Sequence, residues 1–218
     1  MFANNRRLER RLDLIHNLTD HFEVTRVFDN LLFFESQQKF LEGTGSLVMD
    51  RVNKMAYACY SSRTKHEVIL AFEKLTAYTV IKFKAYQSHK GQRLPIYHTN
   101  VMMSIGDNFV LICAEAIDDL NERERVIDSF RYQSKEIILI SQDQLNDFAG
   151  NILQVKNKDN GFFLVMSTRA FQSLNAQQKV QLEKYGTLLH SDLTTIEMLG
   201  GGSARCMIAE IFLPKKKI

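Results

Sequence analysis

Tryptophan is absent from this sequence of 218 residues, and there are only two prolines and three cysteines. Because Cys59, Cys113 and Cys206 are widely spaced, they predict neither a disulfide framework nor a Cys-x-x-Cys metal pair. No apolar run approaches the ~20 residues of a transmembrane helix. The polar, basic stretch 1–11 lacks the apolar segment of a secretory signal. We therefore expect a cytoplasmic protein with no membrane partner.

An excess of one charge sign is also missing, because 28 Lys and Arg face 25 Asp and Glu, which leaves a net charge of +3. So small a charge gives no indication of nucleic acid or a membrane surface as partner. Basic residues are not interleaved with aromatic residues along a face, as a nucleic-acid site would require. Residues that can form a hydrophobic core are abundant, with 45% hydrophobic residues and 15 Phe. A chain of this length can bury such a core without disulfides or structural metal ions, as one large domain or two small ones.

A pattern of strand, strand, helix and strand recurs along the chain. In its first occurrence, residues 44–50 and 53–60 predict a β-hairpin, and residues 64–67 (Thr-Lys-His-Glu) predict a capping box before a helix. An alternating strand, 79–86, completes the unit. The corresponding segments of the next two occurrences are 98–105, 108–114, about 119–133 and 136–140, and then 151–156, 161–166, 168–185 and 187–190.

The first strands of successive units are predicted to begin at Thr44, His98, Ile152 and Cys206, which are spaced evenly at 54 residues. Before the first complete unit, an amphipathic helix over 5–20 and a strand over 24–28 predict half a unit. We therefore predict one incomplete α/β-propeller domain over 1–218. Its parts are a half unit at 1–30, repeat units at about 42–95, 96–149 and 150–203, and a C-terminal strand at 204–218.

Residues at equivalent positions of a cyclic repeat point toward one axis. The starts of the first strands should therefore bring together the turn at Glu42, His98, Asn151 and Cys206. A carboxylate, an imidazole and a thiol at one place form a plausible nucleophilic site. Cys206 follows three consecutive glycines, which allow a ligand to approach the backbone closely. Arg205 and His98 could favour its reactive thiolate.

Each candidate residue also has a purely structural interpretation. Cys206 could be a small buried residue at the start of a strand, and His98 could be a structural histidine. Glu42, in a glycine-rich turn, could be an ordinary loop carboxylate. Cys59 and Cys113 lie in apolar strands and are expected in the core.

Three stretches resemble the motifs of the amidinotransferase and arginine deiminase superfamily, most closely those of the citrulline-utilisation hydrolases. The stretches are Glu-Gly-Thr-Gly-Ser at 42–46, His-Thr-Asn at 98–100 and Gly-Gly-Gly-Ser-Ala-Arg-Cys-Met at 200–207. Residues 5–11 resemble an internal segment of those proteins. The resemblance implies a pentein fold, a five-bladed pseudo-symmetric α/β-propeller, here lacking part of its N-terminal units.

The resemblance also implies a reaction and the residues that carry it. Cys206 would attack the planar carbon of a guanidino or ureido substrate and form a covalent intermediate. His98 would protonate the departing nitrogen and then activate water, while Glu42 would orient the substrate nitrogens. No metal or organic cofactor is implied. The expected substrate-binding residues are Asn100, Arg205 and Gly202.

The chain departs from the arginine deiminase pattern in three places. The corresponding motifs of arginine deiminases resemble Glu-Gly-Gly-Asp and His-x-Asp. This chain has Gly45 and Asn100 in place of the two aspartates, so two carboxylates that would pair with a guanidinium are absent. Since Asn both donates and accepts hydrogen bonds, we expect a neutral, citrulline-like substrate. An acidic substrate-binding residue near an Asn-Asn-Trp stretch has no counterpart here. We therefore expect a gapped ring and a chain that is weak or inactive alone.

Other functions remain open at this point. An amidinotransferase would use an amine instead of water to resolve the intermediate. A non-catalytic pentein-fold binding or assembly protein would keep the motifs without turnover, and a generic α/β domain would have a glycine-rich loop by chance. Unpaired sheet edges would also favour self-association, so a homo-oligomer is plausible.

Overall fold

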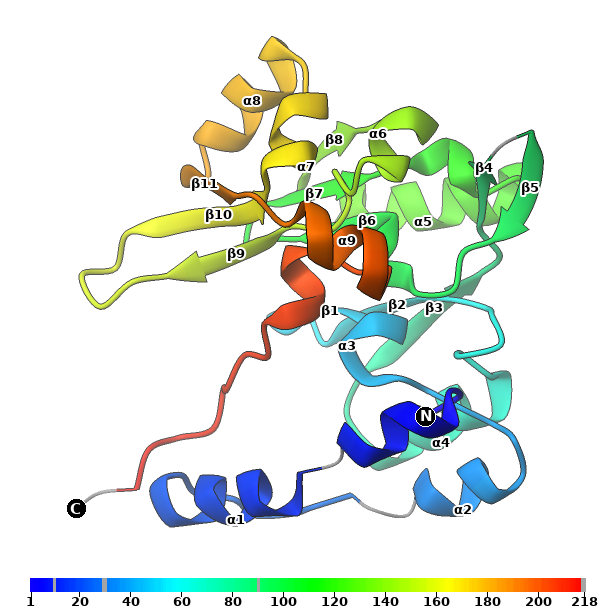
Figure 1. Ribbon diagram of the computed structural model, residues 1–218, viewed down its shortest axis with the longest axis vertical. Coiled ribbons are helices and arrows are strands. Elements are labelled where there is room, and N and C mark those ends of the chain that lie inside the picture. The colour runs from blue at the N-terminus through cyan, green and yellow to red at the C-terminus, as the bar shows by residue number, and fades with distance from the viewer. Residues whose placement is uncertain (10, 29–30, 90, 217–218) are drawn as a thin grey trace.

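The computed structural model describes residues 1–9, 11–28, 31–89 and 91–216 and has a mixed α/β architecture (Figure 1). Arg10, part of the expected N-terminal helix, lies outside the described residues. Residues 29–30 of the expected half unit and 217–218 of the expected C-terminal strand also lie outside them.

Three small sheets share one topology. In each, the second strand is central and pairs antiparallel with the first strand and parallel with the third. A helical connection between the second and third strands makes the parallel pairing possible. The predicted order of strand, strand, helix and strand is thus confirmed in three units. The strands are β1 (Val48–Asp50), β2 (Met55–Cys59) and β3 (Thr79–Phe83); β6 (Met103–Ile105), β7 (Phe109–Ile112) and β8 (Glu136–Leu139); and β9 (Leu153–Lys156), β10 (Phe162–Ser167) and β11 (Thr187–Ser191).

The connecting helices lie where the sequence predicts them, with two differences. In the first unit, Thr64 does not cap the helix, because its hydroxyl donates to Ser46 Oγ at 2.7 Å and Lys65 takes the N-cap position. In the third unit, the predicted helix 168–185 is divided in two, because Asn175 forms a capping box that starts a new helix. The connecting helices are α4 (His66–Leu75), α5 (Leu120–Tyr132), α7 (Thr168–Ser173) and α8 (Ala176–Glu183).

The hydrophobic core is built mainly around the second unit. Strand β7 is buried along its whole length, and Val126 and Phe130 of α5 pack into the same cluster. Cys59 and Cys113 are fully buried, which confirms their predicted place in the core. Strand β6 contacts both β1 and β9, so the first strands of the three units are neighbours, as Figure 1 shows.

A buried ion pair joins the first and second units. Lys135 Nζ lies 2.9 Å from Asp50 Oδ2, with both side chains 2% exposed. The same ammonium group donates to the backbone carbonyls of Gly106 at 3.1 Å and Asp107 at 2.9 Å. Because these partners of the cation are fixed protein oxygens, the contact holds the β1 end against the turn between β6 and β7.

The N-terminal region differs from the predicted half unit. It contains η1 (Asn4–Glu9), α1 (Leu12–His21) and α2 (Leu31–Ser36), and α1 buries none of its side chains. The predicted strand 24–28 is wrong, since these residues have no regular structure. A strand needs a neighbouring strand to receive its backbone hydrogen bonds. Near these residues, the β-type pairing is an isolated bridge between Phe22 and Lys215.

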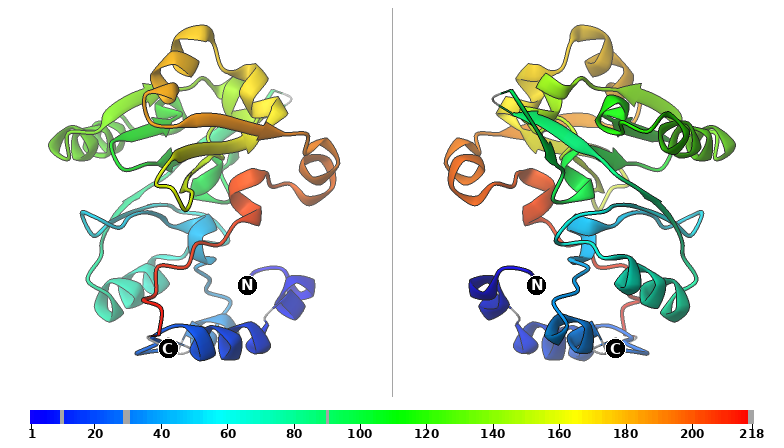
Figure 2. Two further views of the ribbon diagram at one scale, coloured as in Figure 1. Left: turned by 90° about the vertical axis from the view of Figure 1, so that its left-hand side faces the viewer. Right: turned by 90° about the vertical axis from the view of Figure 1, so that its right-hand side faces the viewer.

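The predicted strand from Cys206 to Leu213 is also wrong. The chain forms the short helix η4 (Ala204–Met207) and then runs without regular structure toward α1 (Figure 2). The turn forms because the Cys206 amide donates to the Ser203 carbonyl at 3.0 Å, while residues 208–213 form no strand pairing. The five-unit ring and the domain boundaries stay predictions.

Shorter elements complete the described chain. None of its helices combines the length and apolar character needed to cross a membrane. The remaining elements are α3 (Gly43–Ser46), β4 (Tyr86–His89), β5 (Gln92–Pro95), η2 (Thr99–Val101), η3 (Ala114–Ala116), α6 (Gln142–Asn146) and α9 (Thr194–Gly200).

Candidate active site

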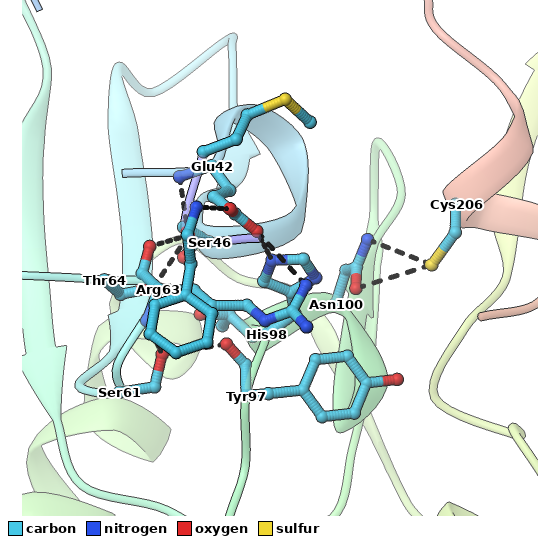
Figure 3. A network of polar contacts seen from close by, with 12 residues as sticks. Glu42, Ser46, Ser61, Arg63, Thr64, Tyr97, His98, Asn100 and Cys206 are labelled. Atoms are coloured by element: carbon cyan, nitrogen blue, oxygen red, sulfur yellow. Dashed lines mark hydrogen bonds and ion pairs between the residues drawn. The ribbon is translucent and has the colours of Figure 1, made fainter. Parts of the chain in front are cut away.

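Two of the predicted site residues stand at the starts of neighbouring units and touch. Glu42 is the N-cap residue of α3, and His98 is the N-cap residue of η2. Glu42 Oε2 lies 2.8 Å from His98 Nε2 (Figure 3). The spacing of the repeat therefore identified a real contact between residues 56 positions apart in the chain.

Glycine is needed at two positions of α3 next to this contact. Gly43 has a φ of +51°, in the left-handed region that disfavours side chains. At Gly45 the constraint is space, because an added Cβ would lie 2.8 Å from His98 Nδ1 and 2.9 Å from Cε1. The Gly-x-Gly pattern thus lets the backbone of α3 press against the imidazole, which fixes the ring against Glu42.

Glu42 is held as an anion by its surroundings. Burial alone would raise its pKa, but hydrogen bonds from His98 and the Phe2 amide, with the charges of His98 and Arg63, lower that pKa to about 2. The Phe2 amide lies 2.7 Å from Oε1, and Arg63 Nη1 lies 3.3 Å from Oε2. Both carboxylate oxygens are therefore engaged by protein groups.

A buried serine connects the Glu42 turn to η2. Ser46 Oγ accepts a hydrogen bond from the Glu42 amide at 2.9 Å and donates to the Arg63 carbonyl at 3.0 Å. The Ser46 carbonyl accepts from Thr99 Oγ1 at 2.6 Å. Because Thr99 directly follows His98, these bonds fix the distance between the carboxylate and the imidazole. Neither Ser46 nor Thr99 was predicted as part of the site, although both lie within the matching motifs.

Cys206 is exposed at the end of the glycine-rich loop. Helix α9 ends at Gly200, and its C-cap residue Gly201 has a φ of +66°, which turns the chain toward η4. Gly202 lies directly against the cysteine, because a Cβ there would come within 3.1 Å of Cys206 Cβ and 3.2 Å of Sγ. The loop glycines thus leave room for the thiol. A substrate contact of Gly202 stays a prediction.

Two asparagine amides face the sulfur atom. Asn100, which is 3% exposed, places Nδ2 at 3.7 Å and Oδ1 at 3.8 Å from Cys206 Sγ. Asn151 Nδ2 is nearer, at 3.3 Å. Asn151 was predicted to reach this place, but no role was predicted for it. Its signal in the sequence was its position one residue before Ile152 in the regular spacing.

The Arg205 guanidinium is engaged by groups other than the thiol. Its guanidinium donates to the Ile208 carbonyl at 2.9 Å and pairs with Glu210 at 3.3 Å. Burial lowers the pKa of Arg205, while Glu210 and Cys206 counteract the shift. Arg205 also borders a cavity of about 660 Å³, which Asn100 lines as well. A direct role of Arg205 in substrate binding stays a prediction.

Asn100 lies between His98 and Cys206 in Figure 3. In the described part of the chain, His98 and Cys206 share no hydrogen bond with each other. Tyr97 helps to bring the two sides together, because its hydroxyl donates to the Gly201 carbonyl. Burial and the nearby Cys206 raise the pKa of Tyr97 to about 12, so the phenol stays a donor at neutral pH.

The assembled groups suit nucleophilic chemistry on a planar carbon. They comprise an exposed thiol, two amides beside it and an imidazole oriented by an ionised carboxylate. Among the described residues, no cluster of three or more His, Cys, Asp or Glu side chains is placed to hold a metal ion.

Comparison with solved structures identifies the fold. ArgZ, an arginine dihydrolase from the ornithine-ammonia cycle in cyanobacteria, matches in its apo form with a TM-score of 0.62 and 16% identity, over 88% of this chain and 31% of that chain. Its substrate-bound N-terminal domain matches with a TM-score of 0.62 and 19% identity, over 85% of this chain and 65% of that domain.

Unliganded AgrE matches with a TM-score of 0.61 and 20% identity, over 81% of this chain and 23% of that chain. The chain thus spans less than two thirds of these proteins. At such identities the likeness shows the fold alone, which is that of the pentein proteins.

Sequence comparison identifies the family. A search of curated proteins found no match. The family model described as "N,N dimethylarginine dimethylhydrolase, eukaryotic" matches residues 1–213, nearly the whole chain. The chain therefore belongs to the N,N-dimethylarginine dimethylhydrolase family, within the arginine deiminase superfamily that its motifs resemble.

Proposed function

We propose that this chain carries the active site of a thiol-dependent hydrolase, which cleaves a carbon–nitrogen bond in a guanidino or ureido group of a small molecule. The observation that carries the proposal is the pairing of Glu42 with His98 at 2.8 Å, beside the exposed thiol of Cys206. Membership of the dimethylarginine dimethylhydrolase family supports this reaction class. The structurally similar ArgZ is an arginine dihydrolase whose N-terminal domain has been solved with substrate and with product bound, which agrees with the proposal.

In the first half of the reaction, the Cys206 thiolate adds to the planar carbon and forms a carbon–sulfur bond. The carbon–nitrogen bond to the leaving amine then breaks, and that nitrogen takes a proton from His98. A separation between His98 and Cys206 suits this step, because the reacting carbon and the leaving nitrogen must fit between them. Glu42 supports the protonated imidazole that this role requires, since its carboxylate stays ionised.

In the second half, a water molecule replaces the amine. His98, now neutral, takes a proton from the water as the oxygen attacks the same carbon, and the carbon–sulfur bond breaks to release Cys206 as thiolate. The reaction consumes one water and needs no change of oxidation state. In this step Glu42 stabilises the imidazolium that forms, much as a carboxylate does for the histidine of other nucleophilic enzymes.

We propose further that the substrate is uncharged and citrulline-like. The Glu42 carboxylate is already paired with His98 and Arg63, so it is poorly available to balance a guanidinium. Asn100 presents both atoms of its amide to the sulfur, at 3.7 Å and 3.8 Å, and can match a ureido group without adding charge. The likeness of the motifs to those of citrulline-utilisation hydrolases agrees with this choice.

We also propose that the three sheets belong to a ring of five such units. The neighbouring positions of β1, β6 and β9 support this arrangement, since the first strands of a ring line its centre. On this proposal, the site lies at the end of that central channel where the units begin.

The experiment compares citrulline, arginine and N,N-dimethylarginine as substrates under single-turnover conditions, with the protein in excess. We expect slow product formation that disappears in Cys206→Ser, and a higher kcat/KM for citrulline than for arginine. Cys113→Ser is the matched control and should keep the activity, because Cys113 is fully buried in the hydrophobic core. Hydrolysis that survives in Cys206→Ser would refute the proposal, and a clear preference for arginine would refute the neutral substrate.

Product analysis with and without an added amine separates hydrolysis from amidino transfer. A hydrolase releases the same product in both reactions, whereas a transferase would pass the carbon group to the amine. Transfer to the amine as the main outcome would contradict the proposed reaction.

A further inference from the structure

We propose that Asn151 is a further catalytic residue of this site, whose side-chain amide donates a hydrogen bond to the Cys206 sulfur and stabilises the thiolate. The inference rests on the proposed function, because it assigns a role in preparing the proposed nucleophile. Stabilisation of the Cys206 thiolate can also be tested on the thiol alone, without any substrate.

The Asn151 side chain makes three contacts at once. Its Nδ2 lies 2.7 Å from the backbone carbonyl oxygen of Asn100 and 3.3 Å from Cys206 Sγ. Its Oδ1 accepts a hydrogen bond from the Arg205 amide at 3.1 Å. A primary amide has two N–H donors, so one serves the carbonyl and the other serves the sulfur.

These partners also decide which way the amide points. The Arg205 amide is a donor and needs an acceptor, whereas the Asn100 carbonyl is an acceptor and needs a donor. Rotating the Asn151 amide by half a turn would place an NH₂ against an N–H and an oxygen against an oxygen. The hydrogen-bond network therefore fixes Nδ2 on the side of the sulfur.

The amide is held rigidly in that position. Asn151 is 0% exposed, and its backbone amide donates to the Phe148 carbonyl at 2.8 Å. The preceding Gly150 packs so closely that a Cβ there would lie 2.5 Å from the Val101 carbonyl oxygen. This close approach brings Asn151 against Asn100, where burial keeps bulk water away from its donors.

A fixed donor at 3.3 Å from sulfur has a chemical consequence. A hydrogen bond donated to the charged form of a group favours that form, and the thiolate is the reactive form of cysteine. Because the donor is already in place, no reorganisation is needed when the thiolate forms or is released again. Asn100 reaches the same sulfur only at 3.7 Å, so Asn151 is the stronger donor of the two.

The test is the pH dependence of Cys206 alkylation by iodoacetamide, a small neutral reagent that does not resemble the proposed substrate. Cys59 and Cys113 contribute little background, because burial raises the pKa of each to about 12. The informative variant is Asn151→Asp, which keeps an oxygen for the Arg205 amide but loses the donor. Asn151→Ala removes both interactions.

We expect the pH midpoint of alkylation to rise by about one to two units in both variants, as loss of a hydrogen bond to a charged group implies. Asn157→Asp is the matched control, since this side chain caps the turn between β9 and β10 and should leave the midpoint unchanged. A lower melting temperature with an unchanged midpoint would show a merely structural role and overturn the inference.

A second measurement uses the unmodified chain and does not depend on how the variants fold. In ¹⁵N spectra, one asparagine side-chain amide should shift with the same pH midpoint as alkylation, and that shift should vanish in Cys206→Ser. If no asparagine amide follows the thiol titration, the inference is wrong. Failure of the proposed function would appear separately, as a normal alkylation profile without hydrolysis of any tested substrate.

Discussion

Replacing Glu42 by glutamine should destabilise the protein at neutral pH, and the loss should shrink as the pH falls. The carboxylate is almost fully buried, with a side chain 9% exposed, and is paired with His98 at 2.8 Å and Arg63 at 3.3 Å. A glutamine at this position would keep the shape of the side chain but not its charge. The substitution therefore removes the ion pairs while it disturbs the packing very little.

The size of the effect follows from the lowered pKa. The pKa of Glu42 falls from 4.5 to about 2 in the folded chain. Each unit corresponds to about 1.4 kcal/mol, so the ionised form contributes about 3 kcal/mol to the free energy of unfolding at pH 7.

The pH dependence of this contribution to the free energy of unfolding follows from the same two pKa values. A carboxyl group with a lowered pKa in the folded state stabilises the protein above its unfolded pKa. The contribution is therefore complete at pH 7 and decreases below 4.5 toward 2. By linkage, about 1 kcal/mol should be lost by pH 4 and about 2 kcal/mol by pH 3.

Urea unfolding followed by circular dichroism at pH 7, 5 and 4 measures this difference. Glu42→Gln should lower the unfolding free energy by about 3 kcal/mol at pH 7, and the two proteins should converge in acid. Glu183→Gln, at an exposed residue of α8, is the matched control and should show no convergence. A constant difference between wild type and Glu42→Gln from pH 7 to 4 would refute the reasoning.

Two further substitutions test the packing around the site and between the units. Gly202→Ala should displace the thiol and slow alkylation of Cys206 by iodoacetamide, because a Cβ would lie 3.2 Å from Sγ, whereas Gly200→Ala has open space and should react normally. Equal rates in the two variants would contradict this. Lys135→Met should lower the unfolding free energy by about 3 kcal/mol or more in urea titrations, because it leaves Asp50 buried without its cation. A loss below about 1 kcal/mol would show that the pair is not important for stability.

The repeat could be predicted because its signals are local. Alternating apolar residues and helical spacing are properties of each segment by itself, and all three of the three-stranded sheets have the predicted order. The spacing of 54 residues marks the site better than it marks the strands. Thr44 lies in α3 and Cys206 lies in η4, so at these two positions a short helical turn stands before or in place of the predicted strand.

The errors in the prediction have a common physical cause, which is dependence on partners distant in the sequence. Residues 24–28 and 206–213 have the composition of strands, but they do not pair with a neighbouring strand. Thr64 resembles a helix cap, but Ser46 takes its hydroxyl. Asn151 had the right position, yet its role depends on contacts with Asn100, Arg205 and Cys206 that no local pattern reveals.

Labelling with chloroacetamidine tests the central claim most directly, because this reagent carries an amidine group that an activated thiol in a guanidino or ureido site should recognise. The labelled residue is identified by peptide mass spectrometry at neutral pH. We predict that Cys206 is modified far faster than Cys59 or Cys113, and that citrulline slows the modification. Labelling of Cys206 at the rate of a free thiol, without protection by citrulline, arginine or N,N-dimethylarginine, would contradict a catalytic role for this residue.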